Sequence, residues 1–244
     1  MATIALDAGH WHHEAGRRCW KQFDPKETRE WTLNDRVISR VETMLAEYEG
    51  VKTVRVDDRT GKTFIGVNQR ATSANNAKAD IYISQHHNAD IRGGSGGGLV
   101  VIRYKGSKKS LSSKALYDAI LNRTGLKGDR SEPLAERDNL AVLKNTTMEA
   151  YLIEGGFMDS SSDVPVIITD TYAQNAAQGI VDFLVTKYSL KKKAVPVANK
   201  DYVLPDGKFF RVVVGSYQSR NNAEDVQKRL KEAGFDSFLA IYEK

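Results

Sequence analysis

Hydrophobic residues along the chain form short runs that alternate with longer amphipathic stretches. The run TIALDAG at residues 3–9 ends in glycine and is typical of a buried strand that opens onto a loop. Similar runs predict strands at 51–56, 80–84, 99–104 and 150–154. Amphipathic stretches predict helices at 31–48, 67–78, 111–123 and 171–188. This alternation predicts an α/β domain with a mostly parallel, twisted sheet flanked by helices.

The pattern changes after residue 190. Residues 191–207 contain a lysine run, two of the five prolines and little periodicity, which indicates a linker between a domain at 1–190 and a small unit at 208–244. In that unit, residues 208–215 alternate like a strand, 222–233 predict a helix, and 235–242 predict a last strand. A single β-α-β unit of this size favours packing on a partner surface.

The composition bears on where the protein is made and whether it enters a membrane. Cys19 is the only cysteine, so no intramolecular disulfide can form. No apolar run is long enough for a membrane span, and the N-terminus lacks the features of a secretory signal. We therefore expect synthesis in the cytoplasm and no membrane insertion.

The net charge is +5, and most of the excess lies after residue 190. This excess fits either a solvated, lysine-rich tail or attraction to a polyanion such as nucleic acid or an anionic cell wall. Because no nucleic-acid-binding motif is present, we expect no nucleic-acid partner.

All five histidines lie in two clusters. They are His10, His12, His13, His86 and His87. His10 follows the first predicted strand, His86 follows the strand at 80–84, and Glu154 ends the strand at 150–154. Ligands of open α/β sheets gather at the carboxyl ends of strands, so these three side chains can converge. A hydrolytic zinc site needs about three ligands, an open position and a nearby carboxylate.

Some of these histidines can have an ordinary structural role instead of binding a metal. A histidine in a loop can simply satisfy a hydrogen bond, and we favour that interpretation for His12, His13 and His87. Glu154 is different, because a carboxylate that follows an apolar strand is costly unless it is paired or functional.

Four motifs in order resemble the zinc amidases of the amidase-3 family. They are LDAGH at 6–10, EWTLN at 30–34, RATSANNAKADIYISQHHNA at 70–89 and IEGGF at 153–157. The resemblance covers roughly residues 2–188. It implies cleavage of peptidoglycan between N-acetylmuramic acid and L-alanine of the stem peptide. It also implies an enzyme that acts on the cell wall after release, by phage lysis as an endolysin or by mother-cell lysis as an autolysin.

The resemblance also implies roles for residues. His10, Glu30 and His86 would bind Zn²⁺, Glu154 would be the general acid/base, and Asn88 would support the ligands; Arg70 would be structural. Glu14 and Glu27 also lie between the histidine clusters, and only the spacing to Asn34 selects Glu30. The chain departs from the family pattern at Trp11-His12-His13 and at Asp159-Ser160, which we expect to alter the rim of the groove.

Residues 208–243 resemble half of a SPOR domain, a family that binds peptidoglycan glycan. Because only one β-α-β half is present, we expect two chains to complete the module as a homodimer. Packing of the half-module on its own catalytic domain is the alternative. For the whole chain, a zinc peptidase cutting within the stem and a non-catalytic peptidoglycan-binding protein are the competing functions.

Overall fold

The structure is a computed structural model that describes residues 1–128, 132–194, 215, 217, 219–235 and 237–241. The chain divides into two compact units, Met1–Lys193 and Ala194–Lys244. We describe each unit by itself. The predicted boundary at 190 lies among the described residues, whereas the boundary at 207 and the first predicted strand of the small unit, residues 208–215 except 215, lie outside them.

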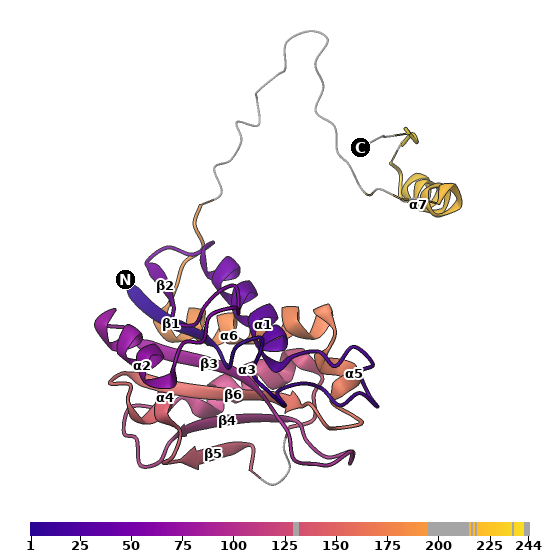
Figure 1. Ribbon diagram of the computed structural model, residues 1–244. Coiled ribbons are helices and arrows are strands. Elements are labelled where there is room, and N and C mark those ends of the chain that lie inside the picture. Colours follow the sequence, from indigo (N-terminus) through magenta and orange to yellow (C-terminus); the bar gives the residue numbers. More distant parts are fainter. Residues whose placement is uncertain (129–131, 195–214, 216, 218, 236, 242–244) are drawn as a thin grey trace. The chain divides into compact units, whose positions relative to one another are not determined.

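A six-stranded sheet forms the centre of the first unit (Figure 1). Its strands are β1 (Ala2–Ala8), β2 (Val51–Arg55), β3 (Ile81–Asn88), β4 (Leu99–Tyr104), β5 (Leu134–Arg137) and β6 (Glu149–Phe157). Their spatial order is β2-β1-β3-β6-β4-β5. Every neighbouring pair is parallel except β4 with β6, which is antiparallel. The predicted mostly parallel α/β sheet is therefore confirmed.

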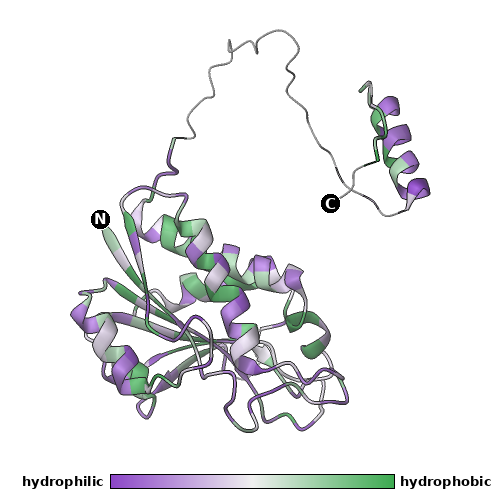
Figure 2. Ribbon diagram, turned by 45° about the horizontal axis from the view of Figure 1, so that its top comes forward, coloured by the Kyte–Doolittle hydropathy of each residue, from purple (hydrophilic) through white to green (hydrophobic). Residues whose placement is uncertain are grey.

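Helices cover both faces of this sheet. They are α1 (Glu30–Leu45), α2 (Val67–Asn76), α3 (Ser113–Thr124), α4 (Ala141–Lys144), α5 (Val164–Ile167) and α6 (Asp170–Tyr188). Helices α1, α3 and α6 pack together over one face, and α2 and α4 pack together over the other. The larger hydrophobic cluster lies under α1, α3 and α6. Figure 2 shows how hydrophobic and hydrophilic residues are distributed over these elements.

Two strands extend further than their apolar runs predict. Strand β3 continues through His86 to Asn88, and β6 continues past Glu154 to Phe157. The two strands pair in register, with His86 opposite Glu154. Pairing of β3 with β1 ends at Gln85, but its pairing with β6 continues to Asn88, so the strand extends beyond its apolar residues on that side. His86 therefore lies within a strand and not after it.

Helix α7 (Arg220–Glu232) is the element of the small unit that the structure describes. It matches the predicted helix at 222–233, and Gly234 follows with a positive φ of 87°, as a left-handed helix end requires. The predicted strand at 235–242 is wrong for the described residues 235 and 237–241, which form no strand. An isolated strand is not stable without a paired strand, and the described residues of this unit contain no second strand. Across the described residues of the whole chain, no helix is long and apolar enough to cross a membrane.

A buried ion pair anchors the end of β1. The Arg70 side chain donates to Asp7 Oδ1 at 2.6 Å, to the Ala8 carbonyl at 2.8 Å and to the His10 carbonyl at 2.6 Å. Tyr82 and Ser84 donate to the other oxygen of Asp7. Burial opposes ionisation of Asp7, but the charges of Arg70 and His86 and the hydrogen bonds from Ser84 and Tyr82 together outweigh it and hold the pKa of Asp7 below its ordinary value. Arg70 therefore has the structural role that the resemblance implies, and it fixes the turn that carries His10.

Replacing Arg70 should destabilise the catalytic unit strongly. In Arg70→Met the Asp7 carboxylate stays buried without its cation, which should cost about 3 kcal/mol of unfolding free energy. The exposed Arg59, which pairs with Glu42, is the matched control, and Arg59→Met should cost less than about 1 kcal/mol. Urea unfolding followed by tryptophan fluorescence measures this, since all three tryptophans lie in the catalytic unit. Equal, small losses in the two variants would show that Arg70 is not an anchor.

Candidate metal centre

His10 lies on a tight turn directly after β1. Its backbone has a positive φ of 66°, which is uncommon for a residue with a side chain. Gly9 precedes it, and a Cβ atom at that position would lie 2.1 Å from the His86 ring. The turn therefore needs glycine at residue 9 so that the two imidazoles can approach. Their ring centroids are 4.9 Å apart at an interplanar angle of 81°.

Glu30 is brought to the same place by the first turn of α1. Its backbone N–H donates to the Arg17 carbonyl at 3.0 Å, so the start of the helix is fastened to the loop after β1. The positive end of the helix dipole favours a carboxylate at this position. The Glu30 side chain is 1% exposed, whereas those of His10 and His86 are each 15% exposed.

The three side chains meet with the geometry of a metal site. Glu30 Oε1 lies 3.3 Å from His10 Nε2 and 3.3 Å from His86 Nδ1, and one ligand atom from each residue lies within 4.8 Å of the others. Tetrahedral zinc with ligands at about 2.0–2.1 Å places neighbouring ligand atoms about 3.3–3.4 Å apart. These distances are at the long end of the range for N–H···O hydrogen bonds. The spacing thus fits a cation between the three groups.

The charges of the cluster also suit a cation. Burial opposes ionisation of Glu30, but hydrogen bonds and charge from His10 and His86 outweigh it and hold the pKa of Glu30 far below its ordinary value. The other carboxylate oxygen, Oε2, is buried and has no hydrogen-bond partner among the described residues. A buried carboxylate with an unpaired oxygen is costly without a cation. Two imidazoles and a carboxylate form a donor set that zinc accepts.

A second set of groups orients these ligands. His10 Nδ1 lies 2.9 Å from Glu14 Oε2, and the remaining nitrogen of a zinc-binding histidine commonly bonds a carboxylate in this way. The backbone N–H of His87 donates to Glu30 Oε1 at 3.1 Å. The Asn34 side chain donates to the Gly9 carbonyl at 3.1 Å. The helix start and both histidine-bearing segments are therefore tied together.

His87 is a buried neutral histidine. Its Nδ1 donates to Asn34 Oδ1 at 2.8 Å, and burial lowers the pKa of His87 to about 4. This hydrogen bond agrees with the ordinary interpretation of that residue. His12 and His13 lie on the loop after His10 and pack on each other, with ring centroids 5.2 Å apart. Trp11 packs edge-to-face on His13 and on the exposed Phe64. The residues that depart from the family pattern at 11–13 thus form an aromatic cluster beside the site.

Glu154 lies in β6, in register with His86 on the neighbouring strand. The residue is partly exposed, but its Oε2 atom is buried and has no hydrogen-bond partner among the described residues. Burial raises the pKa of Glu154 well above its ordinary value, the Glu30 charge raises it further, and the Arg17 charge opposes them. A carboxyl group with a raised pKa can serve as a general base and then as a general acid.

Asn88 lies at the end of β3. Its side-chain oxygen accepts a hydrogen bond from the Ala89 N–H at 2.8 Å, so the contact that the structure shows is local. Asp159, the other departure from the family pattern, organises the loop that follows. Its Oδ2 accepts hydrogen bonds from the backbone N–H groups of residues 90, 91 and 92 at 2.8–2.9 Å. Asp159 therefore shapes the loop after β3.

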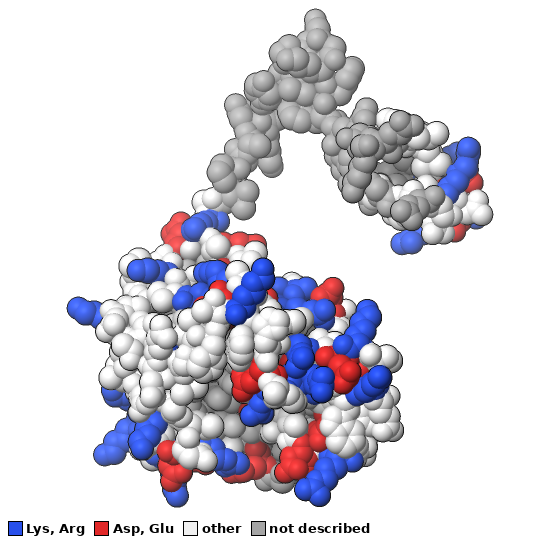
Figure 3. Space-filling view, in the orientation of Figure 1, with Lys and Arg blue, Asp and Glu red and all other residues white. Residues whose placement is uncertain are grey.

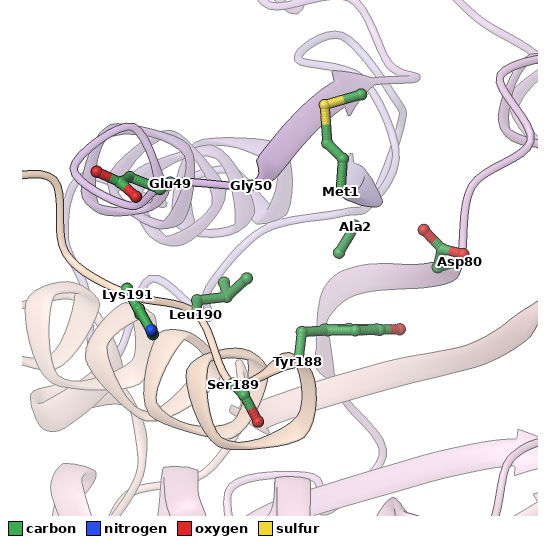
Figure 4. A pocket seen from close by; sticks show the side chains of 9 residues that line it. All are labelled: Met1, Ala2, Glu49, Gly50, Asp80, Tyr188, Ser189, Leu190 and Lys191. Atoms are coloured by element: carbon green, nitrogen blue, oxygen red, sulfur yellow. The ribbon is translucent and has the colours of Figure 1, made fainter.

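A separate surface hollow lies away from this cluster. Figure 4 shows it at the amino end of β1, lined by Met1, Ala2, Glu49, Gly50, Asp80, Tyr188, Ser189, Leu190 and Lys191, with a volume of about 470 Å³. Because His10 follows the carboxyl end of β1, the hollow and the cluster lie at opposite edges of the sheet. Sites in α/β sheets form at the carboxyl edge, so we place the functional site at His10, Glu30 and His86. Figure 3 shows basic and acidic residues interspersed over the face of the catalytic unit that it displays.

Comparison with known proteins identifies the family. Residues 4–186 match the N-acetylmuramoyl-L-alanine amidase family, and the chain belongs to it. Residues 177–240 match the SPOR domain, so that match begins inside α6, a helix of the catalytic unit.

Relatives in sequence and structure agree with this family. The chain is 32% identical over 221 residues to the endolysin of Bacillus phage SPP1, covering 86% of this chain and 75% of that protein. It is 27% identical over 242 residues to the sporulation-specific N-acetylmuramoyl-L-alanine amidase of Bacillus subtilis, covering 99% and 85%. The fold resembles the N-acetylmuramoyl-L-alanine amidase from Clostridium difficile 630, with a TM-score of 0.68, 25% identity and coverage of 77% and 97%.

Proposed function

We propose that this chain hydrolyses the amide bond between N-acetylmuramic acid and L-alanine in bacterial peptidoglycan, with Zn²⁺ held by His10, Glu30 and His86. Membership of the amidase family and the 3.3 Å spacing of the three ligand atoms support this proposal. The observation that carries it is the buried Glu30 carboxylate between two imidazoles, whose Oε2 has no hydrogen-bond partner among the described residues, because that arrangement is costly without a cation in direct contact.

The metal would supply one part of the chemistry. When bound, zinc lowers the pKa of a water molecule toward about 7 and polarises a carbonyl group. Glu14 keeps the His10 ring in one orientation, and the His87 N–H and the helix start hold the Glu30 carboxylate. These contacts fix the ligands before substrate arrives.

Glu154 would carry the proton. Its carboxylate accepts a proton from the attacking water, and the resulting acid donates this proton to the nitrogen of L-alanine as the amide bond breaks. The raised pKa of Glu154 suits both halves of this transfer. The buried Oε2 atom has no hydrogen-bond partner among the described residues, so no protein contact there competes with the proton transfer.

The product of cell-wall digestion tests the proposed function. Purified cell wall is digested with the full chain, and the newly formed amino terminus is identified. We expect L-alanine. Another amino-terminal residue would show a peptidase that cuts within the stem, and the absence of any new amine from zinc-loaded protein would show a non-catalytic wall-binding protein.

The C-terminal unit is proposed to bind glycan strands of the wall, in line with the SPOR match. The homodimer expected from a single β-α-β half stays a prediction. Sedimentation of the full chain at micromolar concentration tests it, since we expect twice the mass of one 27.2 kDa chain. A species with the mass of one chain would contradict the homodimer and leave the glycan-binding proposal standing.

A further inference from the structure

The loop between β1 and α1 carries an arginine, Arg17, whose backbone is fixed and whose side chain forms only long ion-pair contacts among the described residues. Residues 18 and 29 form an antiparallel bridge, and hydrogen bonds join the Glu30 N–H to the Arg17 carbonyl and the Cys19 N–H to the Thr28 carbonyl. These contacts place the backbone of Arg17 directly across from the proposed ligand Glu30.

The guanidinium group of Arg17 has no hydrogen bond to any residue in the described part of the chain. Its Nη1 lies 4.0 Å from Glu30 Oε2, and its Nε lies 3.9 Å from Glu14 Oε1. Both distances are too long for hydrogen bonds. The side chain is 49% exposed. Its charge also acts on Glu154, whose pKa it lowers against the larger effect of burial.

Arg17 is therefore a half-exposed cation beside the proposed ligand Glu30, and its guanidinium donors form no hydrogen bond among the described residues. The guanidinium fork matches a carboxylate with two parallel hydrogen bonds. The stem peptide supplies such a group next to the scissile bond, because its second residue is isoglutamate, with a free α-carboxylate, or the amide isoglutamine. The glycan side of the bond carries no comparable anion close to the lactyl carbonyl.

We infer that Arg17 binds the α-carboxylate of the second stem residue and so selects stems with isoglutamate over stems with isoglutamine. This inference rests on the proposed function, because it takes the muramoyl peptide as substrate. Arg17 acts as a specificity residue and leaves the proton transfer to Glu154.

Arg18 provides a matched control on the next position. Its side chain is similarly exposed, at 44%, but its Nε is directed to Glu27 at 3.4 Å and not to the metal ligands. Removing either arginine changes the net charge of the loop by the same amount. A general charge effect would therefore appear in both variants, and a specific contact only in the Arg17 variant.

The experiment measures binding by the zinc-loaded full chain in which Glu154→Gln prevents turnover. Two muramoyl tripeptides that differ only in isoglutamate or isoglutamine are titrated by calorimetry. We expect tighter binding of the isoglutamate compound, and Arg17→Ala should weaken that binding about tenfold or more. It should leave the isoglutamine compound unchanged, and Arg18→Ala should change neither.

Two results would overturn the inference. One is an unchanged ratio of the two dissociation constants in Arg17→Ala, and the other is an equal loss in Arg17→Ala and Arg18→Ala. The proposed function fails separately, when the chain with Glu154 intact releases no L-alanine amino terminus from either compound. The ratio of the two dissociation constants can be measured whether or not the chain cleaves either compound.

Discussion

Glu154→Gln is expected to retain a full equivalent of zinc and to lose at least about 100-fold in turnover of the muramoyl amide. A general acid/base contributes about 100- to 10,000-fold, and an amide side chain of the same size cannot accept the proton. Because glutamine has the shape of glutamic acid, the fold and the three ligands should be unaffected. Steady-state release of new amino termini, measured beside zinc content, gives the result.

The control for this variant lies on the same strand. Glu149 begins β6, forms an ion pair with Lys187 at 2.8 Å and is not one of the three proposed ligands. Glu149→Gln should therefore keep its turnover. Near-normal turnover in Glu154→Gln would remove Glu154 from the mechanism. A loss of zinc in that variant would instead make Glu154 part of the metal site.

His86→Ala is expected to lose most of its zinc and at least about 1,000-fold in turnover. The variant keeps only two of three ligands, and a metal contributes several kcal/mol to stabilising the transition state. Zinc per chain after dialysis, measured by atomic emission spectroscopy, is the direct readout. His10→Ala should behave in the same way.

His13→Ala is the comparison, because this exposed histidine contacts Trp11 and His12 and lies outside the cluster. It should keep its zinc and its turnover. A full equivalent of zinc in purified His86→Ala would refute the ligand role of His86.

The apolar runs predict the sheet well, because buried strands and amphipathic helices are set by local periodicity. Strands β1 and β4 and helices α1, α2, α3 and α6 lie within a few residues of their predicted ranges. Strand β5 and helices α4 and α5 were not predicted, since each has only four residues and forms through packing. The antiparallel pairing of β4 with β6 also depends on tertiary contacts and leaves no pattern in the chain.

The site is predictable to different degrees. His10 and Glu154 stand out because each follows a run of apolar residues, and the structure places them toward the carboxyl ends of β1 and β6, the two strands that flank β3. Glu30 follows a long loop with no periodicity, so only its resemblance to the family motif selects it over Glu14 and Glu27. Glu14 orients His10 through a loop contact, and the rule that a ligating histidine bonds a carboxylate could have indicated it.

The position of Arg17 beside Glu30 could not be predicted from the sequence. It depends on the short antiparallel pairing between residues 17–19 and 28–30, which joins two ends of an irregular loop. Rim contacts by basic residues of this loop fit its composition, but the sequence does not distinguish Arg17 from Arg18. Their different carboxylate neighbours appear only in three dimensions.

X-ray diffraction at the zinc absorption edge, from crystals of the full chain grown with zinc, tests the central claim most directly. The account predicts one anomalous peak about 2.0–2.2 Å from His10 Nε2, His86 Nδ1 and a carboxylate oxygen of Glu30, with Glu154 facing its open side. A peak elsewhere, such as between His12 and His13, with none between the three proposed ligands would contradict it.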